Sequence, residues 1–171
     1  KLQTALQLAP EDPLTLRKMA DIYLESNDFE SAQAFVDEIV EKTPNDPLAI
    51  LLSSWLESKD QEKLVNNDRL EQLNEIMNSL SPELIADQPV LYYISGLTAF
   101  FHGNTEQATR DFTQYLQQNP NDPQAIVLLA RTYLMTQQNR QALTLLEKHE
   151  DKLLENVDSA LLLGDLYLKQ N

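Results

Sequence analysis

Apolar residues recur along most of this chain every three or four positions, the spacing that places them on one face of an α-helix. Two such runs lie between residues 13 and 46. Their members are Leu16, Met19, Ala20 and Tyr23, then Ala32, Phe35, Val36 and Ile39. Asn27 and Asp28 between the runs are residues typical of turns. The pattern therefore predicts two helices that fold back on each other.

A short punctuation, Pro-x-Asp-Pro, interrupts this pattern three times, at residues 10–13, 44–47 and 120–123. The first proline stops a helix, the Asp caps the next one, and the second proline suits its first position. The first two copies are 34 residues apart, and the third follows the second after 76, one period of 34 and one of 42. Recurrence at such a period predicts an array of helical repeats.

The array divides the chain into units with predicted boundaries. We expect the second helix of a preceding repeat at 1–12, regular units at 13–46, 89–122 and 123–156, a longer irregular unit at 47–88, and the first helix of a further unit at 157–171. The eight extra residues of the irregular unit fit either its inter-helix turn or the stretch after Leu80. Both ends then fall inside repeats, so we expect the helix at 157–170 to fray or to associate.

The chain resembles the tetratricopeptide repeat, whose motif combines a bulky residue, a Leu-Gly pair, a Tyr, a small Ala and a closing Pro. Unit 89–122 offers Tyr92, Ser95, Gly96, Ala99, Ala108, Phe112 and Pro120. Gly96 and Gly164 fall at the position where the two helices cross, and a small residue there lets the backbones approach. The resemblance implies an all-α, right-handed superhelical solenoid of antiparallel helix pairs.

In the resembled family, the first helix of each unit lines a concave groove that binds partners. By position, the candidate groove residues here are Leu51, Trp55, Tyr93, Leu97, Phe101, Val127, Arg131 and Met135. An exposed apolar surface with aromatic residues marks an interaction site, so we expect it to receive a partner helix or an extended peptide. Two alternatives stay open. In the first, some of these side chains pack between adjacent first helices or are covered by the irregular segment after Ser58. In the second, the same surface joins two copies of the chain as a homodimer.

The charge of the chain argues against several partners. The formal net charge is -14, from 27 acidic and 13 basic residues, and such a chain repels phosphate backbones and anionic lipids. We therefore expect no nucleic-acid partner. No apolar run is long enough to span a membrane, and the absence of cysteine removes disulfides and thiolate chemistry.

The residues that usually carry catalysis or bind metals form no known motif here. His102 and His149 are 47 positions apart, and the sequence contains no HExxH motif, Gly-rich phosphate loop or GxSxG nucleophile elbow. Carboxylates are abundant, as expected for solvated helix faces. We expect no enzymatic activity, no cofactor and no metal.

A narrower resemblance concerns residues 92–97, 103–104 and 128–134. These stretches are similar to the repeat proteins encoded with bacterial exosortase (PEP-CTERM) systems, proposed envelope lipoproteins linked to surface-protein sorting and exopolysaccharide export. The resemblance implies the bacterial periplasm or cell envelope. The sequence as a whole predicts a non-catalytic scaffold that binds a protein partner; the alternative is an architectural or self-associating spacer within a larger repeat protein.

Overall fold

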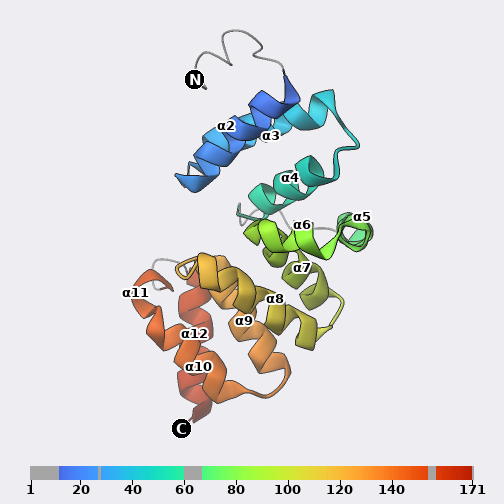
Figure 1. Ribbon diagram of the computed structural model, residues 1–171. Coiled ribbons are helices and arrows are strands. Elements are labelled where there is room, and N and C mark those ends of the chain that lie inside the picture. Colours follow the sequence, from blue (N-terminus) through green and yellow to red (C-terminus); the bar gives the residue numbers. More distant parts are fainter. Residues whose placement is uncertain (1–11, 27, 60–66, 154–156, 171) are drawn as a thin grey trace. The chain divides into compact units, whose positions relative to one another are not determined.

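The computed structural model describes residues 12–26, 28–59, 67–153 and 157–170, and every regular element in these ranges is an α-helix (Figure 1). The predicted all-α class is confirmed. The chain forms two compact units, residues 1–66 and 67–171. The helix expected at residues 1–12 lies almost entirely outside the described residues.

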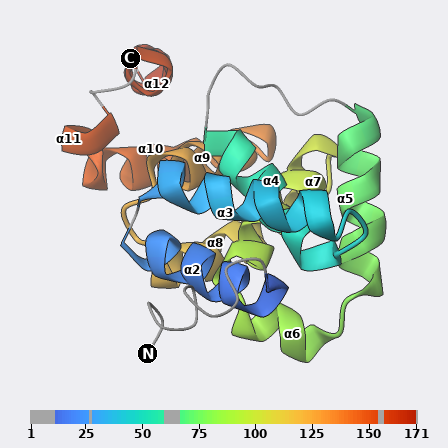
Figure 2. The same cartoon turned by 90° about the horizontal axis from the view of Figure 1, so that it is seen from above.

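The first unit contains α2 (Pro13–Glu25), α3 (Phe29–Lys42) and α4 (Pro47–Lys59). Helices α2 and α3 lie side by side in both views (Figures 1 and 2). Leu16 from α2, Ile39 from α3 and Ala49 from α4 form a buried cluster, and the ring of Tyr23 stacks on Phe35 at 5.5 Å. These apolar residues therefore join three helices into one core.

The second unit contains the remaining helices. They are α5 (Asn67–Ser79), α6 (Pro82–Asp87), α7 (Pro89–Phe101), α8 (Thr105–Gln118), α9 (Pro123–Met135), α10 (Asn139–Lys148), α11 (Glu150–Leu153) and α12 (Val157–Gln170). Helix α7 packs on α8, α8 on α9, and α9 on α10, as expected for consecutive helix pairs. Helix α12, seen end-on in Figure 2, packs on α10.

Three helices begin where the Pro-x-Asp-Pro pattern predicts. Asp12, Asp46 and Asp122 each precede the proline that opens a helix, and each carboxylate accepts hydrogen bonds from the first turn. Thr15 donates its backbone N–H to Asp12 at 3.0 Å, and Gln124 donates to Asp122 at 3.1 Å. These bonds satisfy N–H groups that no carbonyl of the same helix can reach.

The caps of α4 and α9 also receive a side chain from an earlier helix. Arg17 of α2 donates to the second carboxylate oxygen of Asp46. Tyr115 of α8 donates its hydroxyl to the second oxygen of Asp122 at 2.6 Å. Each Asp therefore both starts a helix and ties it to a helix before it.

A short helix lies within residues 47–88, the stretch that the sequence predicts to be a longer irregular unit. Helix α6 follows Leu80, with Ser81 as its N-cap, and occupies one of the two sites that the sequence left open for the eight extra residues. The other site, the inter-helix turn, includes residues 60–66, which lie outside the described ranges.

Helices α7 and α8 approach closely at Gly96. A Cβ added to Gly96 would lie 2.9 Å from two ring carbons of Phe112, closer than packed carbon atoms come. The same crossing carries a polar contact, because Ser95 donates its hydroxyl to Asp111. Gly96 therefore sets how closely these two helices pack, as its position in the motif predicts.

Candidate functional site

The two helices α7 and α9 end in exposed apolar side chains. Phe101, the last residue of α7, is 49% exposed, and Met135, the last residue of α9, is 53% exposed. They occupy the same position in their helices, 34 residues apart. These two side chains are the exposed apolar members of the predicted groove. A partner that covered them would remove apolar surface from water, which favours binding.

The eight predicted groove residues differ in how far the structure buries them. Four of them are buried within the chain: Leu51, Trp55, Tyr93 and Leu97. Val127 is half-buried, and Phe101, Arg131 and Met135 are exposed. Leu51 and Trp55 belong to the first unit, and the other six belong to the second.

Aromatic packing accounts for the burial of the two largest members. The ring of Tyr93 lies 5.2 Å from Tyr115 and 6.0 Å from Phe112, both on α8 and both in edge-to-face geometry. Trp55 of α4 meets the ring of Phe29 edge-on at 5.5 Å. Tyr93 and Trp55 therefore contribute to the core of their units, and a partner cannot contact them without displacing these rings.

Arg131 gives the exposed surface of α9 a positive charge. It lies four residues from Val127 and four from Met135, so the three side chains follow one ridge of the helix. Val127 packs at the edge of the buried cluster formed by α9, α10, α11 and α12. The guanidinium of Arg131 has no ion pair within the part of the chain that the structure describes. The ridge therefore combines apolar surface with an available cation.

A half-buried carboxylate of α8 forms a polar contact with α7. Ser95 of α7 donates its hydroxyl to Asp111 of α8 at 2.5 Å, and Gln107 donates its amide to the same hydroxyl at 3.2 Å. Burial raises the pKa of Asp111 above its ordinary value, and the hydrogen bonds from Ser95 and Gln107 and the charge of Arg110 lower it in part. This arrangement is a polar contact between two helices of one pair.

No cluster suited to a metal occurs within the described ranges. Groups of three or more His, Cys, Asp or Glu side chains that could hold an ion are absent there. His102 lies at the end of α7, with its Nδ1 2.7 Å from the carbonyl oxygen of Thr98. Among the helices that the structure describes, none combines the length and the apolar composition needed to cross a bilayer.

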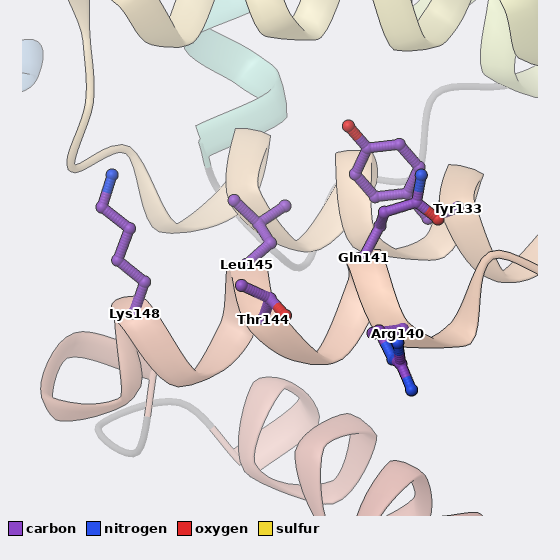
Figure 3. Close-up of a pocket in the computed structure, with 6 residues that line it drawn as sticks. All are labelled: Tyr133, Arg140, Gln141, Thr144, Leu145 and Lys148. Carbon is purple, nitrogen blue, oxygen red and sulfur yellow. The ribbon is translucent and has the colours of Figure 1, made fainter.

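The sequence pattern missed a surface on the second helix of a pair. A cavity of about 400 Å³ is lined by Tyr133, Arg140, Gln141, Thr144, Leu145 and Lys148 (Figure 3). Tyr133 belongs to α9, and the other five belong to α10. Their spacing of three and four residues along α10 was available in the sequence, but the resemblance directed attention to the first helices alone.

Comparison with known proteins identifies the family. A family model described as tetratricopeptide repeat matches residues 1–56 and 102–153, more than half of the chain. The chain belongs to the tetratricopeptide repeat family. The family predicted from the small, Tyr and Pro positions is thereby confirmed. No curated protein matches the chain.

Solved structures of this family share the fold. The thermophilic repeat protein TTC0263 from Thermus thermophilus is 19% identical with a TM-score of 0.56, over 98% of this chain and 87% of that one. A double mutant of MamA RS-1 is 16% identical with a TM-score of 0.58, over 93% and 85%. PilW, a widely conserved type IV pilus biogenesis factor, is 19% identical with a TM-score of 0.53, over 94% and 71%.

Tetratricopeptide repeats are in general non-catalytic modules that bind other proteins. Stacked helix pairs present a long surface that small changes of side chain adapt to different partners. The fold of this chain therefore supports a protein–protein interaction scaffold.

Proposed function

We propose that this tetratricopeptide repeat chain binds a helix or an extended peptide of a partner protein at the exposed ends of α7 and α9. The observation that supports the proposal is the exposure of Phe101 and Met135 at the same position of two successive repeats. Exposed apolar side chains that recur with the repeat present matching contacts to a partner that lies across both helices. Arg131 adds a charge that favours a partner with an acidic group nearby.

The buried and half-buried members of the predicted groove have a supporting role in this proposal. Tyr93 and Leu97 fix the position of α7, and Val127 fixes α9, so that the exposed side chains are presented on rigid helices. Leu51 and Trp55 belong to the first unit, and their contribution to binding stays a prediction. The proposal uses the predicted repeat boundaries, 13–46, 47–88, 89–122 and 123–156, which give Phe101 and Met135 equivalent positions in successive units.

The test compares partner recovery by the native chain with recovery by Phe101→Asp and Met135→Asp. Both side chains are about half exposed, so we expect each variant to fold, as circular dichroism would check. An unpaired carboxylate buried under a partner costs several kcal/mol, so recovery from the native organism should fall at least about tenfold.

A matched control is Gln117→Asp. Gln117 is an exposed residue of α8, outside the predicted groove, and the variant adds the same single charge. Recovery should be unchanged for this control. Equal recovery by all four proteins, or recovery lost equally in the control, would reject the proposed surface.

A second candidate function is that of a self-associating spacer, and α12 favours it. Leu161 and Leu168 lie seven residues apart on this helix and are 63% and 77% exposed. Residues at this spacing share one helix face, which two copies of the chain can bury together. Sedimentation at rising concentration would show a growing mass that the variant Leu161→Asp/Leu168→Asp abolishes. A constant monomer mass would reject this candidate.

The proposal extends to a cell-envelope setting, as in surface-protein sorting or exopolysaccharide export. It rests on the resemblance of residues 92–97, 103–104 and 128–134 to the exosortase-associated repeat proteins. PilW, which shares the fold, is described as a pilus biogenesis factor. Fractionation of cells that carry the tagged chain would test the setting, and recovery with cytosolic markers alone would reject it.

A further inference from the structure

Helix α12 buries one face and exposes another that carries apolar side chains. Leu163 and Leu166 are buried in the cluster that α12 shares with α9, α10 and α11. Leu161, Gly164 and Leu168 lie three, four and seven residues apart, so they share a second face of the helix. Leu161 and Leu168 are 63% and 77% exposed, and no atom lies within 4 Å of a Cβ built on Gly164. This face of α12 is therefore open.

The equivalent face of α7 is covered by a helix. Residues of α12 stand 68 positions after those of α7, two periods of the array, so Tyr93 corresponds to Leu161 and Gly96 to Gly164. The ring of Tyr93 is 1% exposed and packs edge-on against rings of α8. A Cβ on Gly96 would lie 2.9 Å from the ring of Phe112 on the same helix. The pair α7–α8 therefore shows what kind of element fits such a face.

The size of the covering side chain follows the small residue beneath it. In three helix pairs the small residue of the first helix precedes a fully buried apolar side chain by sixteen positions. These pairs of residues are Gly96 and Phe112, Ala130 and Leu146, and Ala20 and Val36. The smallest residue stands with the largest side chain, because glycine leaves room for an aromatic ring where alanine already has a Cβ. Gly164 therefore indicates that the side chain that fits it is an aromatic ring.

A folded second copy of the chain does not have such a ring to offer. In α3, α8 and α10 the covering side chain follows an alanine by four positions. All six of these side chains are 0% exposed, namely Ala32, Val36, Ala108, Phe112, Ala142 and Leu146. A second copy would have to unfold a helix pair to supply them. The ring that fits Gly164 must therefore come from a different protein.

We propose that the exposed face of α12 binds an amphipathic helix of a partner protein that carries the pattern Ala-x-x-x-Phe. The phenyl ring covers Gly164 as Phe112 covers Gly96. Leu161 and Leu168 are buried beside it, which removes their apolar surface from water. The net charge of -14 favours a partner helix that is not itself acidic.

The experiment titrates the whole chain with a capped peptide of the α8 sequence, residues 105–118, that carries Asp111→Leu. The substitution is needed because Ser95, which donates to Asp111, corresponds to Leu163 in α12. The peptide has no net charge. NMR should show saturable backbone amide shifts centred on Gly164. The same peptide with Phe112→Ala should bind at least about tenfold more weakly, because the ring and its contacts are lost.

The variant Gly164→Ala tests whether the ring lies on the glycine. Its added Cβ meets the ring of the bound peptide, so binding should weaken about fivefold although the free helix gains stability. The peptide with Phe112→Leu should bind this variant better than the Phe peptide does, because Leu146 stands with Ala130 in the buried cluster of α9 and α10. General apolar attraction would not reverse the order of the two peptides.

The control is Asn74→Ala, which changes an exposed residue of α5 and should leave peptide binding unchanged. The proposal is overturned by a lack of saturable shifts on α12, by equal binding of the Phe112→Ala peptide, or by equal binding to Gly164→Ala. A chain mass that rises with concentration and falls in Leu161→Asp would assign the face to a second copy, which also overturns it. Phe101→Asp should bind the peptide normally, so this result is independent of the proposed groove.

Discussion

Two glycines at the same position of their repeats have different surroundings. Gly96 and Gly164 are 68 residues apart, two periods of the array. At Gly96 an added Cβ would meet Phe112, a fully buried ring, whereas at Gly164 it would meet nothing within 4 Å. The sequence assigns both glycines to a helix crossing. Among the described residues, a side chain packs against Gly96 but none packs against Gly164.

The pair predicts opposite effects of one substitution. Alanine favours a helix over glycine by about 1 kcal/mol, so Gly164→Ala should stabilise the chain by about that amount. Gly96→Ala gains the same term but forces Phe112 to shift, and overpacking costs about 1–3 kcal/mol, so the net effect should be a loss of up to about 2 kcal/mol. Urea unfolding followed by circular dichroism measures both. A gain in both variants would show that the ring of Phe112 yields freely.

The half-buried carboxylate of Asp111 predicts how stability changes with pH. Burial raises its pKa in the folded chain, so the folded state holds this proton more tightly than the unfolded state does. The contribution of Asp111 is therefore most favourable in acid, and it declines as pH rises from about 4, the ordinary Asp pKa, through the raised folded pKa. The Asn side chain of the variant Asp111→Asn does not titrate. The thermal midpoint of the variant minus that of the native chain should therefore increase as pH rises through that window.

The matched control is Asp165→Asn, which removes an exposed carboxylate on α12 and changes the net charge equally. Its midpoint relative to the native chain should vary much less over the same pH range. Equal slopes for the two variants would mean that general charge, rather than burial of Asp111, sets the dependence.

At the scale of single helices, proline positions in the sequence predict where four of the described helices begin. Pro13, Pro47, Pro89 and Pro123 open α2, α4, α7 and α9, because proline suits the first position of a helix and cannot continue one. The end of α7 was also predictable. Gly103 follows it with φ of 74°, a left-handed conformation that glycine adopts without strain.

The pattern of apolar residues did not predict which groove residues are buried, and it did not predict the short helix α6. Apolar spacing shows which side of α7 avoids water, but not which neighbours cover it, so Tyr93 reads as a groove residue although α8 buries it. Helix α6 is too short for a periodic signal, and only Ser81 and Pro82 indicate its start. The cavity on α10 depends on Tyr133 from another helix, and one sequence does not show that contact.

The cap of α9 supports a prediction about how successive repeats are joined. Asp122 accepts from the backbone of Gln124 and Ala125 with one oxygen and from the hydroxyl of Tyr115 with the other. Tyr115→Phe removes only the second contact and should cost about 0.5–1.5 kcal/mol. Asp122→Ala removes both and should cost about 1–3 kcal/mol. Urea unfolding measures both variants, and an equal loss would mean that the cap itself contributes little.

For the whole molecule, the dominant property is its negative charge. With 27 acidic and 13 basic residues, most carboxylates have no cation of their own to pair with. Some carboxylates also lie beside each other. Glu71 and Glu75 are exposed and four residues apart on α5, a spacing at which like charges repel. Compaction brings such charges together, so repulsion opposes folding at low ionic strength.

Salt should therefore stabilise this chain. Between about 10 mM and about 150 mM ionic strength the screening length falls from roughly 30 Å to roughly 8 Å, which removes most of the repulsion between separated charges. A gain of about 1 kcal/mol corresponds to a rise of about 3 °C in the thermal midpoint for a chain of this size. Glu71→Gln/Glu75→Gln should raise the midpoint at low salt and reduce its salt dependence. A midpoint that falls as sodium chloride is added would mean that attractive ion pairs outweigh the excess of carboxylates.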